Sequence, residues 1–226
     1  NEMFELFLDP TMMYSCAYYP DEKTSLEQAS LAKLQRICDK LQLNESDHVI
    51  EIGTGWGGFA LYAAQNYGCK VTTTTISQQQ HDWAQQRIIE AGLEDQITLL
   101  MEDYRDLQGT YDKLVSIEMI EAVGRAYWPT YFQTIARLLK PGGQACIQSI
   151  VIADTYFDRY VRGTDFIQQY IFPGGCLPSP SAFRQQAQAA GLRVVDEFAF
   201  GLDYAHTLRL WRERFMQVKP QVLALG

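Results

Sequence analysis

The hydrophobic positions of the chain follow two alternating patterns. Runs of four to eight apolar and β-branched residues predict strands at 48–52, 70–75, 96–101, 113–117, 145–152 and 192–198. Apolar residues at helical spacing predict helices over 26–41, 78–91, 131–139 and 181–190, and another from a glycine loop to residue 67. Because strands that alternate with helices are joined by right-handed crossovers, this pattern predicts an α/β fold: a mostly parallel, doubly wound sheet with helices on both faces.

Two segments fall outside this pattern. Residues 1–24 are largely aromatic and irregular, and the insertion 154–180 is rich in Tyr, Phe, Gly and Pro. Doubly wound sheets bind ligands at the carboxyl ends of their strands, so we expect the first segment to form a cap and the second a lid over that edge. The 226 residues are expected to form a single domain.

The composition narrows the classes of function. A hydrophobic share of 47% supports a sizeable core, and the net charge of −8 argues against a nucleic-acid-binding protein, which would need a basic face. No uncharged stretch approaches the roughly 20 apolar residues of a membrane span. The five cysteines form no C-x-x-C pair, which indicates reduced thiols and a cytoplasmic location. The three histidines show no metal-binding spacing, so no metal is expected.

A glycine-rich loop follows the first predicted strand. Gly53, Gly55 and Gly58 match the pattern G-x-G-x-x-G, in which glycine lets the backbone approach a ligand closely. The motif alone is compatible with a dinucleotide site, an S-adenosylmethionine (SAM) site or a purely structural turn. Glu51 favours SAM, because its carboxylate would attract the ammonium group of that ligand and repel a pyrophosphate.

Residues after the next two predicted strands also favour SAM. The second strand ends in three threonines and lacks the acid that binds the ribose of NAD. Asp103 and Tyr104 follow the third strand and offer a polar and a flat aromatic neighbour for an adenine. Since SAM sites usually carry a ribose acid too, we expect Thr75 and Gln80 to replace it. Gln80 also completes a capping box with Ser77, and the two roles are compatible.

The stretch after the fourth predicted strand carries two carboxylates. Glu118 and Glu121 stand three residues apart and would share one face if the stretch is helical. The alternative is a solvated helix start, where glutamate suits the helix dipole. The Pro-rich turn that is common in amine methyltransferases is absent here.

Six segments form an ordered set that runs through most of the chain: 14–18, 51–58, 75–80, 103–107, 116–124 and 170–178. Together they resemble the cyclopropane-fatty-acyl-phospholipid synthase family, which includes mycolic-acid cyclopropane synthases and fatty-acyl C-methyltransferases. The resemblance extends from about residue 4 to the end. It implies a Rossmann-like, class I SAM-dependent methyltransferase fold.

The resemblance also implies an activity. Family members transfer a methylene group from SAM to the cis double bond of an unsaturated fatty-acyl chain, usually in a phospholipid. Methyl transfer leaves a carbocation, and loss of a proton from the new methyl group closes the ring, with bicarbonate as the expected base. Two alternatives stay open: a fatty-acyl C-methyltransferase that leaves a methyl or methylene branch, and a non-catalytic module that binds SAM or lipid.

Matching the family motifs residue by residue gives an expected site. The expected SAM-binding residues are Tyr14, Ser15, Glu51, Gly53, Gly55, Trp56, Gly57, Thr75, Ile76, Gln80, Asp103 and Tyr104. The expected bicarbonate cage consists of the main chain at Cys16 and Ile150 and the side chains of Glu121, Gln148 and Tyr204. Because adjacent anions repel in a dry pocket, Glu121 and the bicarbonate would share a proton.

The chain departs from the family at two points. Several relatives carry histidine where this chain has Gln148, which can donate a hydrogen bond but cannot titrate. The family also continues past the end of this chain with more helix and an antiparallel strand, so we expect a longer functional molecule. The expected partners are an unsaturated phospholipid or acyl chain and, transiently, the inner face of the membrane. A homodimer is left open.

Overall fold

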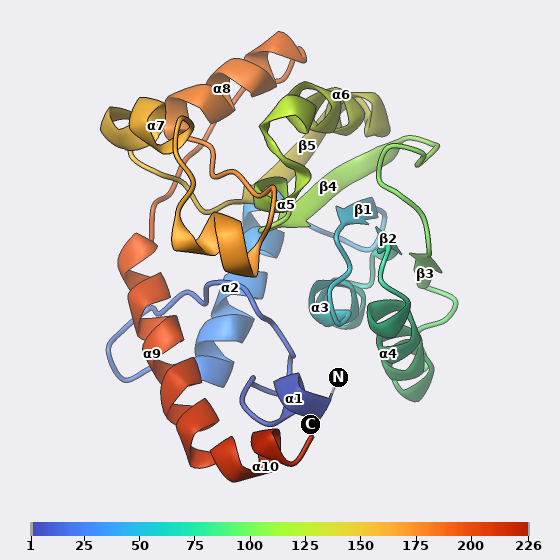
Figure 1. The fold of residues 1–226 in the computed structure, drawn as a ribbon. Coiled ribbons are helices and arrows are strands. Elements are labelled where there is room, and N and C mark those ends of the chain that lie inside the picture. Colours follow the sequence, from blue (N-terminus) through green and yellow to red (C-terminus); the bar gives the residue numbers. More distant parts are fainter. Residues whose placement is uncertain (1, 226) are drawn as a thin grey trace.

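The computed structural model describes residues 2–225, and a five-stranded sheet lies at its centre (Figure 1). The strands are β1 (His48–Ile52), β2 (Lys70–Thr74), β3 (Ile97–Leu100), β4 (Tyr111–Ile117) and β5 (Leu139–Gln148). They lie in the order β3-β2-β1-β4-β5, and every pair is parallel. The order reverses between β1 and β4, which is where doubly wound sheets bind ligands. The predicted α/β fold is confirmed.

Helices cover both faces of the sheet. They are α1 (Glu2–Glu5), α2 (Leu26–Leu41), α3 (Gly58–Tyr67), α4 (Gln78–Glu90), α5 (Ile120–Val123), α6 (Trp128–Leu138), α7 (Asp154–Tyr160), α8 (Pro180–Ala189), α9 (Gly201–Gln217) and α10 (Lys219–Leu223). Side chains of β1 alternate between two cores, because successive residues of a strand point to opposite faces. Val49 joins the core with α2 and α3, whereas Ile50 joins the core with α6 and α8.

The N-terminal segment and α9 lie against each other, although they are far apart in the sequence (Figure 1). The Ala17 N–H donates to the Thr207 hydroxyl at 3.3 Å, and the Tyr19 N–H donates to the Asp203 carboxylate at 2.8 Å. Tyr204, which could have belonged to an ordinary loop, lies in the first turn of α9. The helix thus brings a C-terminal tyrosine next to the N-terminal segment.

The predicted sixth strand at 192–198 is wrong. This segment has no ladder partner among residues 2–225, and the Val195 side chain is 74% exposed. Side-chain contacts hold it instead: the Arg184 guanidinium binds the Glu197 carboxylate at 2.6 and 2.8 Å, and the Arg36 guanidinium lies 3.7 Å from the centre of the Phe198 ring. Apolar runs predict strands only where a neighbouring strand can take their main-chain hydrogen bonds.

The fifth predicted strand is displaced along the chain. It was expected at 145–152, but β5 ends at Gln148 and begins at Leu139, where a register shift precedes its regular pairing with β4. Residues 149–152 leave the sheet. The Ile150 N–H donates to the Glu121 carboxylate and the Ile152 N–H donates to the Pro178 carbonyl, so this part of the chain serves the ligand edge instead of the ladder.

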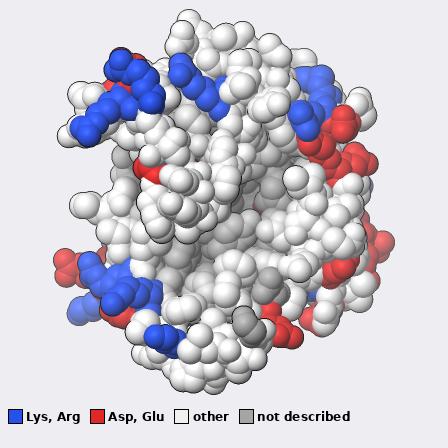
Figure 2. All heavy atoms as spheres, in the orientation of Figure 1, with Lys and Arg blue, Asp and Glu red and all other residues white. Residues whose placement is uncertain are grey.

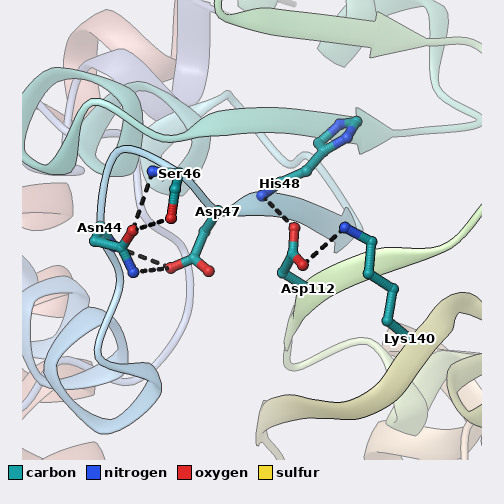
Figure 3. A network of polar contacts seen from close by, with 6 residues as sticks. All are labelled: Asn44, Ser46, Asp47, His48, Asp112 and Lys140. Carbon is teal, nitrogen blue, oxygen red and sulfur yellow. Dashed lines mark hydrogen bonds and ion pairs between the residues drawn. The ribbon is translucent and has the colours of Figure 1, made fainter.

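The opposite, amino edge of the sheet is closed by polar contacts (Figure 3). The Asp112 carboxylate accepts from the His48 N–H at 2.9 Å and from the Lys140 ammonium at 2.8 Å, which joins the starts of β1, β4 and β5. Asp47 accepts from the Asn44 N–H and side-chain amide at 3.0 and 2.9 Å in the turn before β1. The fixed amino edge leaves the carboxyl edge as the place where loops can hold a ligand.

Three observations bear on the location of the protein and on its thiol and metal chemistry. None of the helices within residues 2–225 combines the length and the apolar character needed to cross a bilayer. The five cysteines are free thiols. Over the same residues, no group of His, Cys, Asp and Glu side chains is arranged to hold a metal ion.

Candidate functional site

The loop between β1 and α3 lies at the carboxyl edge of the sheet. Gly53 and Gly57 have φ angles of 101° and 84°, which other residues rarely adopt. A Cβ atom on Gly58 would lie 2.7 Å from the Met13 sulfur and 2.9 Å from the Thr11 carbonyl oxygen. Glycine is therefore required here for two reasons: it forms the turn, and it lets the N-terminal segment pack directly on the start of α3.

Tyr14 extends over the same loop. A Cβ atom on Gly55 would lie 3.3 Å from the Tyr14 ring. The Gln80 amide donates to the Tyr14 hydroxyl at 3.1 Å and accepts from the Thr75 hydroxyl at 3.0 Å, while the Gln80 N–H donates to the Ser77 hydroxyl at 3.4 Å. Gln80 thus caps α4 with its main chain and turns its side chain toward the N-terminal segment. Both predicted roles are geometrically available at once.

Glu51 lies beneath the loop and is only 2% exposed. Its carboxyl group accepts from the Thr73 hydroxyl at 2.6 Å, and the Thr73 and Thr54 hydroxyls are 2.7 Å apart. Burial raises the pKa of Glu51 to about 8, and the hydrogen bond from Thr73 offsets this only in part. A cation beside Glu51 would favour its ionised form. The side chain therefore suits the ammonium group of a ligand such as SAM.

The remaining predicted cofactor residues differ in their exposure. Trp56 and Tyr104 are 5% and 8% exposed, so their side chains pack within the protein. Ile76 is 77% exposed just after β2. The Asp103 carboxylate accepts two hydrogen bonds from the Arg105 guanidinium, at 2.7 and 2.9 Å, which lower the pKa of Asp103 and keep it ionised. Of these side chains, Ile76 and Asp103 are the ones placed to contact a ligand.

Three hydrogen-bond donors converge on the Glu118 carboxylate. Its Oε1 atom accepts from the Cys16 N–H at 2.8 Å and from the Gln148 amide at 2.9 Å. Its Oε2 atom accepts from the Tyr204 hydroxyl at 2.9 Å. Burial and the negative charge of Glu118 raise the pKa of Tyr204, so this hydroxyl stays protonated and donates. Glu118 thereby links the N-terminal segment, β5 and α9.

A second carboxylate, Glu121, lies beside this cluster in α5. One of its oxygens accepts from the Ile150 N–H, and its Oε2 atom is buried without a hydrogen-bond partner among residues 2–225. Burial raises the pKa of Glu121 to about 7, and the nearby charge of Glu118 adds to the effect. The pair therefore holds one group that gains or loses a proton near neutral pH.

The structure brings together all five residues expected around bicarbonate, but Glu118 occupies the centre. The predicted cage did not include Glu118, which was expected to share a helical face with Glu121. That expectation is wrong, because Glu118 precedes α5 and has a φ of 49°. The donors of Cys16, Gln148 and Tyr204 already bind a protein carboxylate, so the arrangement does not fit an additional bicarbonate ion.

Sequence reasoning missed a buried cation under the site. Lys33, in α2, is 2% exposed, and its ammonium donates to the Ser15 hydroxyl at 2.6 Å. Burial lowers the pKa of Lys33 to about 8, and the negative charge of Glu118 counteracts part of this shift. An amphipathic helix gives no signal for a lysine on its buried side. Lys33 supplies positive charge beneath a site that holds two carboxylates.

The face around this site is hollowed and largely uncharged (Figure 2). Atoms around the hollow belong mostly to residues other than Lys, Arg, Asp and Glu, which gather at the periphery of the view. The insertion contributes aromatic side chains to the surface: Phe166, Tyr170 and Phe172 are 66%, 65% and 64% exposed, and the last two flank the π-helix turn η2 (Ile167–Ile171). This surface suits an apolar ligand better than a charged one.

Comparison with known proteins supports the predicted resemblance. The family model described as mycolic acid cyclopropane synthetase matches residues 1–226. The tuberculostearic acid methyltransferase of Mycobacterium tuberculosis is 42% identical over 100% of this chain and 55% of its own length. The cyclopropane-fatty-acyl-phospholipid synthase of Escherichia coli is 44% identical over 98% of this chain and 56% of its own length. The chain therefore spans just over half the length of these two curated relatives.

A solved structure agrees with these sequence matches. The mycolic acid cyclopropane synthase CmaA1 in complex with SAH and CTAB aligns with a TM-score of 0.91 and 29% identity, covering 100% of this chain and 82% of that one. SAH is what remains of SAM after methyl transfer. The predicted class I SAM-dependent methyltransferase fold and the predicted family resemblance are both confirmed.

Proposed function

Because the chain belongs to the mycolic acid cyclopropane synthetase family, we propose that it is a SAM-dependent methyltransferase that adds a methylene group across the cis double bond of an unsaturated fatty-acyl chain. One observation carries the proposal beyond the family: two carboxylates, Glu118 and Glu121, lie beside an uncharged hollow at the carboxyl edge of the sheet. A partly buried acid–base pair next to an apolar surface is what proton removal from a hydrocarbon requires.

The residues around the glycine loop fit the methyl donor. SAM supplies an electrophilic methyl group on a sulfonium centre when it is bound. We assign the ammonium end to the buried Glu51, the ribose to Thr75 and Gln80, and the adenine to the region of Ile76 and Asp103. Ser15, Gly53, Gly55 and Gly57 contribute backbone, with Tyr14 over the loop; Trp56 and Tyr104 support it from within.

Chemistry at an alkene sets the demands on the rest of the site. The π electrons form a bond to the methyl carbon as the carbon–sulfur bond breaks, which leaves a positive charge on the other alkene carbon. Removal of a proton from the new methyl group lets its C–H electron pair close the ring. The site must therefore align the alkene, exclude water and accept a proton. No step is assigned to bicarbonate, because the donors expected to hold it bind Glu118.

The acyl chain is assigned to the hollow next to the insertion 154–180. The exposed Phe166, Tyr170 and Phe172 can pack against methylene groups or insert shallowly among lipids. We therefore propose a phospholipid substrate reached by transient contact with the inner face of the membrane, from a cytoplasmic location.

The decisive experiment uses the full-length protein, labelled SAM and vesicles of a cis-unsaturated phospholipid. The proposal expects acyl chains heavier by one CH₂ unit and without olefinic protons in the NMR spectrum of the lipid extract. A saturated vesicle should give no product. Binding of SAM without turnover on several unsaturated lipids would contradict the proposal and favour a non-catalytic binding module.

A second candidate is a fatty-acyl C-methyltransferase whose product carries a methyl or methylene branch. The observation that favours it is the 42% identity to a relative named tuberculostearic acid methyltransferase. Both reactions share the methyl-transfer step and differ in where the cation loses its proton. The NMR spectrum separates them, since a methylene branch keeps olefinic protons at a shifted position and a cyclopropane does not.

A further inference from the structure

We propose that the Glu118 carboxylate is the anion of this site and acts as the base, so that the protein needs no small anion from solution. This inference rests on the proposed function and identifies the group that takes the proton. It departs from the expectation of a bound bicarbonate. The carboxylate presents two oxygens on one carbon in a plane, as bicarbonate does, and it already occupies the donors expected for that ion.

The hydrogen bonds around Glu118 form a cage. The three donors are a main-chain N–H of Cys16, a side-chain amide of Gln148 and a phenol of Tyr204, and they come from three separate parts of the chain. All three distances lie between 2.8 and 2.9 Å. An arrangement of fixed donors around one carboxylate holds that group in place and keeps it ionised.

The backbone of Glu118 gives independent support. Its φ of 49° lies in the left-handed region, which among residues 2–225 only two other non-glycine residues, Met12 and Gln42, share. Gln42 has the ordinary reason that it ends α2, whereas Glu118 caps no helix. The Glu118 N–H donates to the Gln148 carbonyl at 2.8 Å, which fixes this conformation. Glycine would adopt it without strain, so the glutamate is kept for its side chain.

The charges nearby fit a base at Glu118. The neighbouring Glu121 lies in a buried position where the neutral form is favoured near pH 7, so the pair carries one negative charge more readily than two. The buried ammonium of Lys33 lies close enough for the two groups to influence each other electrostatically. These neighbours allow an ionised Glu118 in a site that excludes water.

The proposed step balances as follows. The alkene π pair forms the new bond to the methyl carbon, and the carbon–sulfur pair stays on the leaving sulfide. Glu118 then takes one proton from the new methyl group and becomes a neutral carboxylic acid. The released C–H pair bonds to the cationic carbon and closes the ring. No oxidant or further reactant is required, and the proton returns to solvent after product release.

The test compares the full-length wild-type protein with Glu118→Gly and Glu118→Gln, with and without added bicarbonate in CO₂-free buffer. Wild-type turnover should change less than about twofold on adding bicarbonate. Turnover of both variants should fall by about 100-fold or more, the usual range for loss of a general base. Millimolar bicarbonate should restore Glu118→Gly by at least about tenfold but should not restore Glu118→Gln, whose amide fills the same space.

A binding measurement separates this inference from the proposed function. The ¹³C resonance of labelled bicarbonate should broaden with Glu118→Gly and stay sharp with the wild type and with Glu94→Gln, an exposed carboxylate change. This readout needs no turnover, so it remains decisive if no lipid is converted. If Glu118→Gly does not fold by circular dichroism, the wild-type titration alone decides. Wild-type turnover that requires bicarbonate, or wild-type broadening, would overturn the inference.

Discussion

Glu121 illustrates how much one buried side chain decides at the residue scale. One oxygen accepts from the Ile150 N–H and the other has no partner among residues 2–225, in a setting that raises the pKa of Glu121 to about 7. We expect Glu121→Gln to reduce turnover by about 100-fold, because the amide cannot exchange a proton with the reacting groups. Affinity for SAM should change less than about threefold, since Glu121 does not belong to the proposed donor site.

Initial rates with unsaturated phospholipid vesicles and a calorimetric titration with SAM measure the two effects of Glu121→Gln. Glu94→Gln serves as the matched control, because Glu94 is exposed in the turn between α4 and β3. An unchanged rate in Glu121→Gln would remove Glu121 from the chemistry and leave it a structural role next to Ile150.

Lys33 provides a test that concerns stability alone. Its pKa is lowered from 10.5 to about 8 in the folded protein, so between these pH values the unfolded chain binds more protons than the folded one. The contribution of Lys33 to the free energy of unfolding therefore rises with pH through this window. The difference in that free energy between wild type and Lys33→Met should grow by about 1–3 kcal/mol from pH 7 to pH 10.5.

Urea unfolding at several pH values measures this difference for Lys33→Met. Subtraction cancels the tyrosines and cysteines that titrate in the same range. Lys23→Met, at an exposed lysine, should show a flat difference. A flat difference for Lys33→Met as well would mean that Lys33 does not titrate differently in the folded and unfolded states.

At the element scale, the N-terminal segment and α3 depend on each other. A Cβ on Gly58 would meet the Thr11 carbonyl oxygen at 2.9 Å, and a main-chain atom cannot move as readily as the neighbouring Met13 side chain. We expect Gly58→Ala to destabilise the protein by about 1–3 kcal/mol and to weaken SAM binding by about tenfold, because Tyr14 would lose its position over the loop. Thermal unfolding and a SAM titration measure both effects.

Gly201→Ala is the matched control for Gly58→Ala, since nothing lies within 4 Å of a Cβ at Gly201. It should leave the SAM affinity unchanged. Limited proteolysis supplies a further readout: Gly58→Ala should expose residues 2–24 to cleavage. Wild-type affinity together with wild-type protection would show that the segment packs on α3 without needing glycine there.

The elements of the sheet core were predictable because each has a periodic pattern and a stop signal, as for α4 with its Ser77 cap. The segment 192–198 was not, because its apolar run gives no information on whether a strand lies beside it. The same reason applies to the site. The resemblance identified Cys16, Gln148 and Tyr204, but the position of Glu118 among them follows from a left-handed φ that residue spacing does not predict.

The whole molecule combines a negative net charge with an uncharged hollow, so its approach to lipid must depend on apolar contact more than on charge. Phe166, Tyr170 and Phe172 of the insertion are the exposed aromatic residues placed for this contact. We expect their simultaneous replacement by serine to raise the KM for vesicle-embedded phospholipid by about tenfold, because each removes apolar area that would leave water at the membrane surface.

The triple serine variant has a sharper consequence when two forms of substrate are compared. With the same lipid dispersed in detergent micelles, where no bilayer has to be entered, kcat and KM should stay within about threefold of wild type. Leu223→Ser, in α10 and 70% exposed, controls for the loss of an exposed apolar side chain elsewhere. If the triple variant lost activity equally on both substrates, the aromatic residues would position the acyl chain itself, and contact with the bilayer would have to arise from another surface.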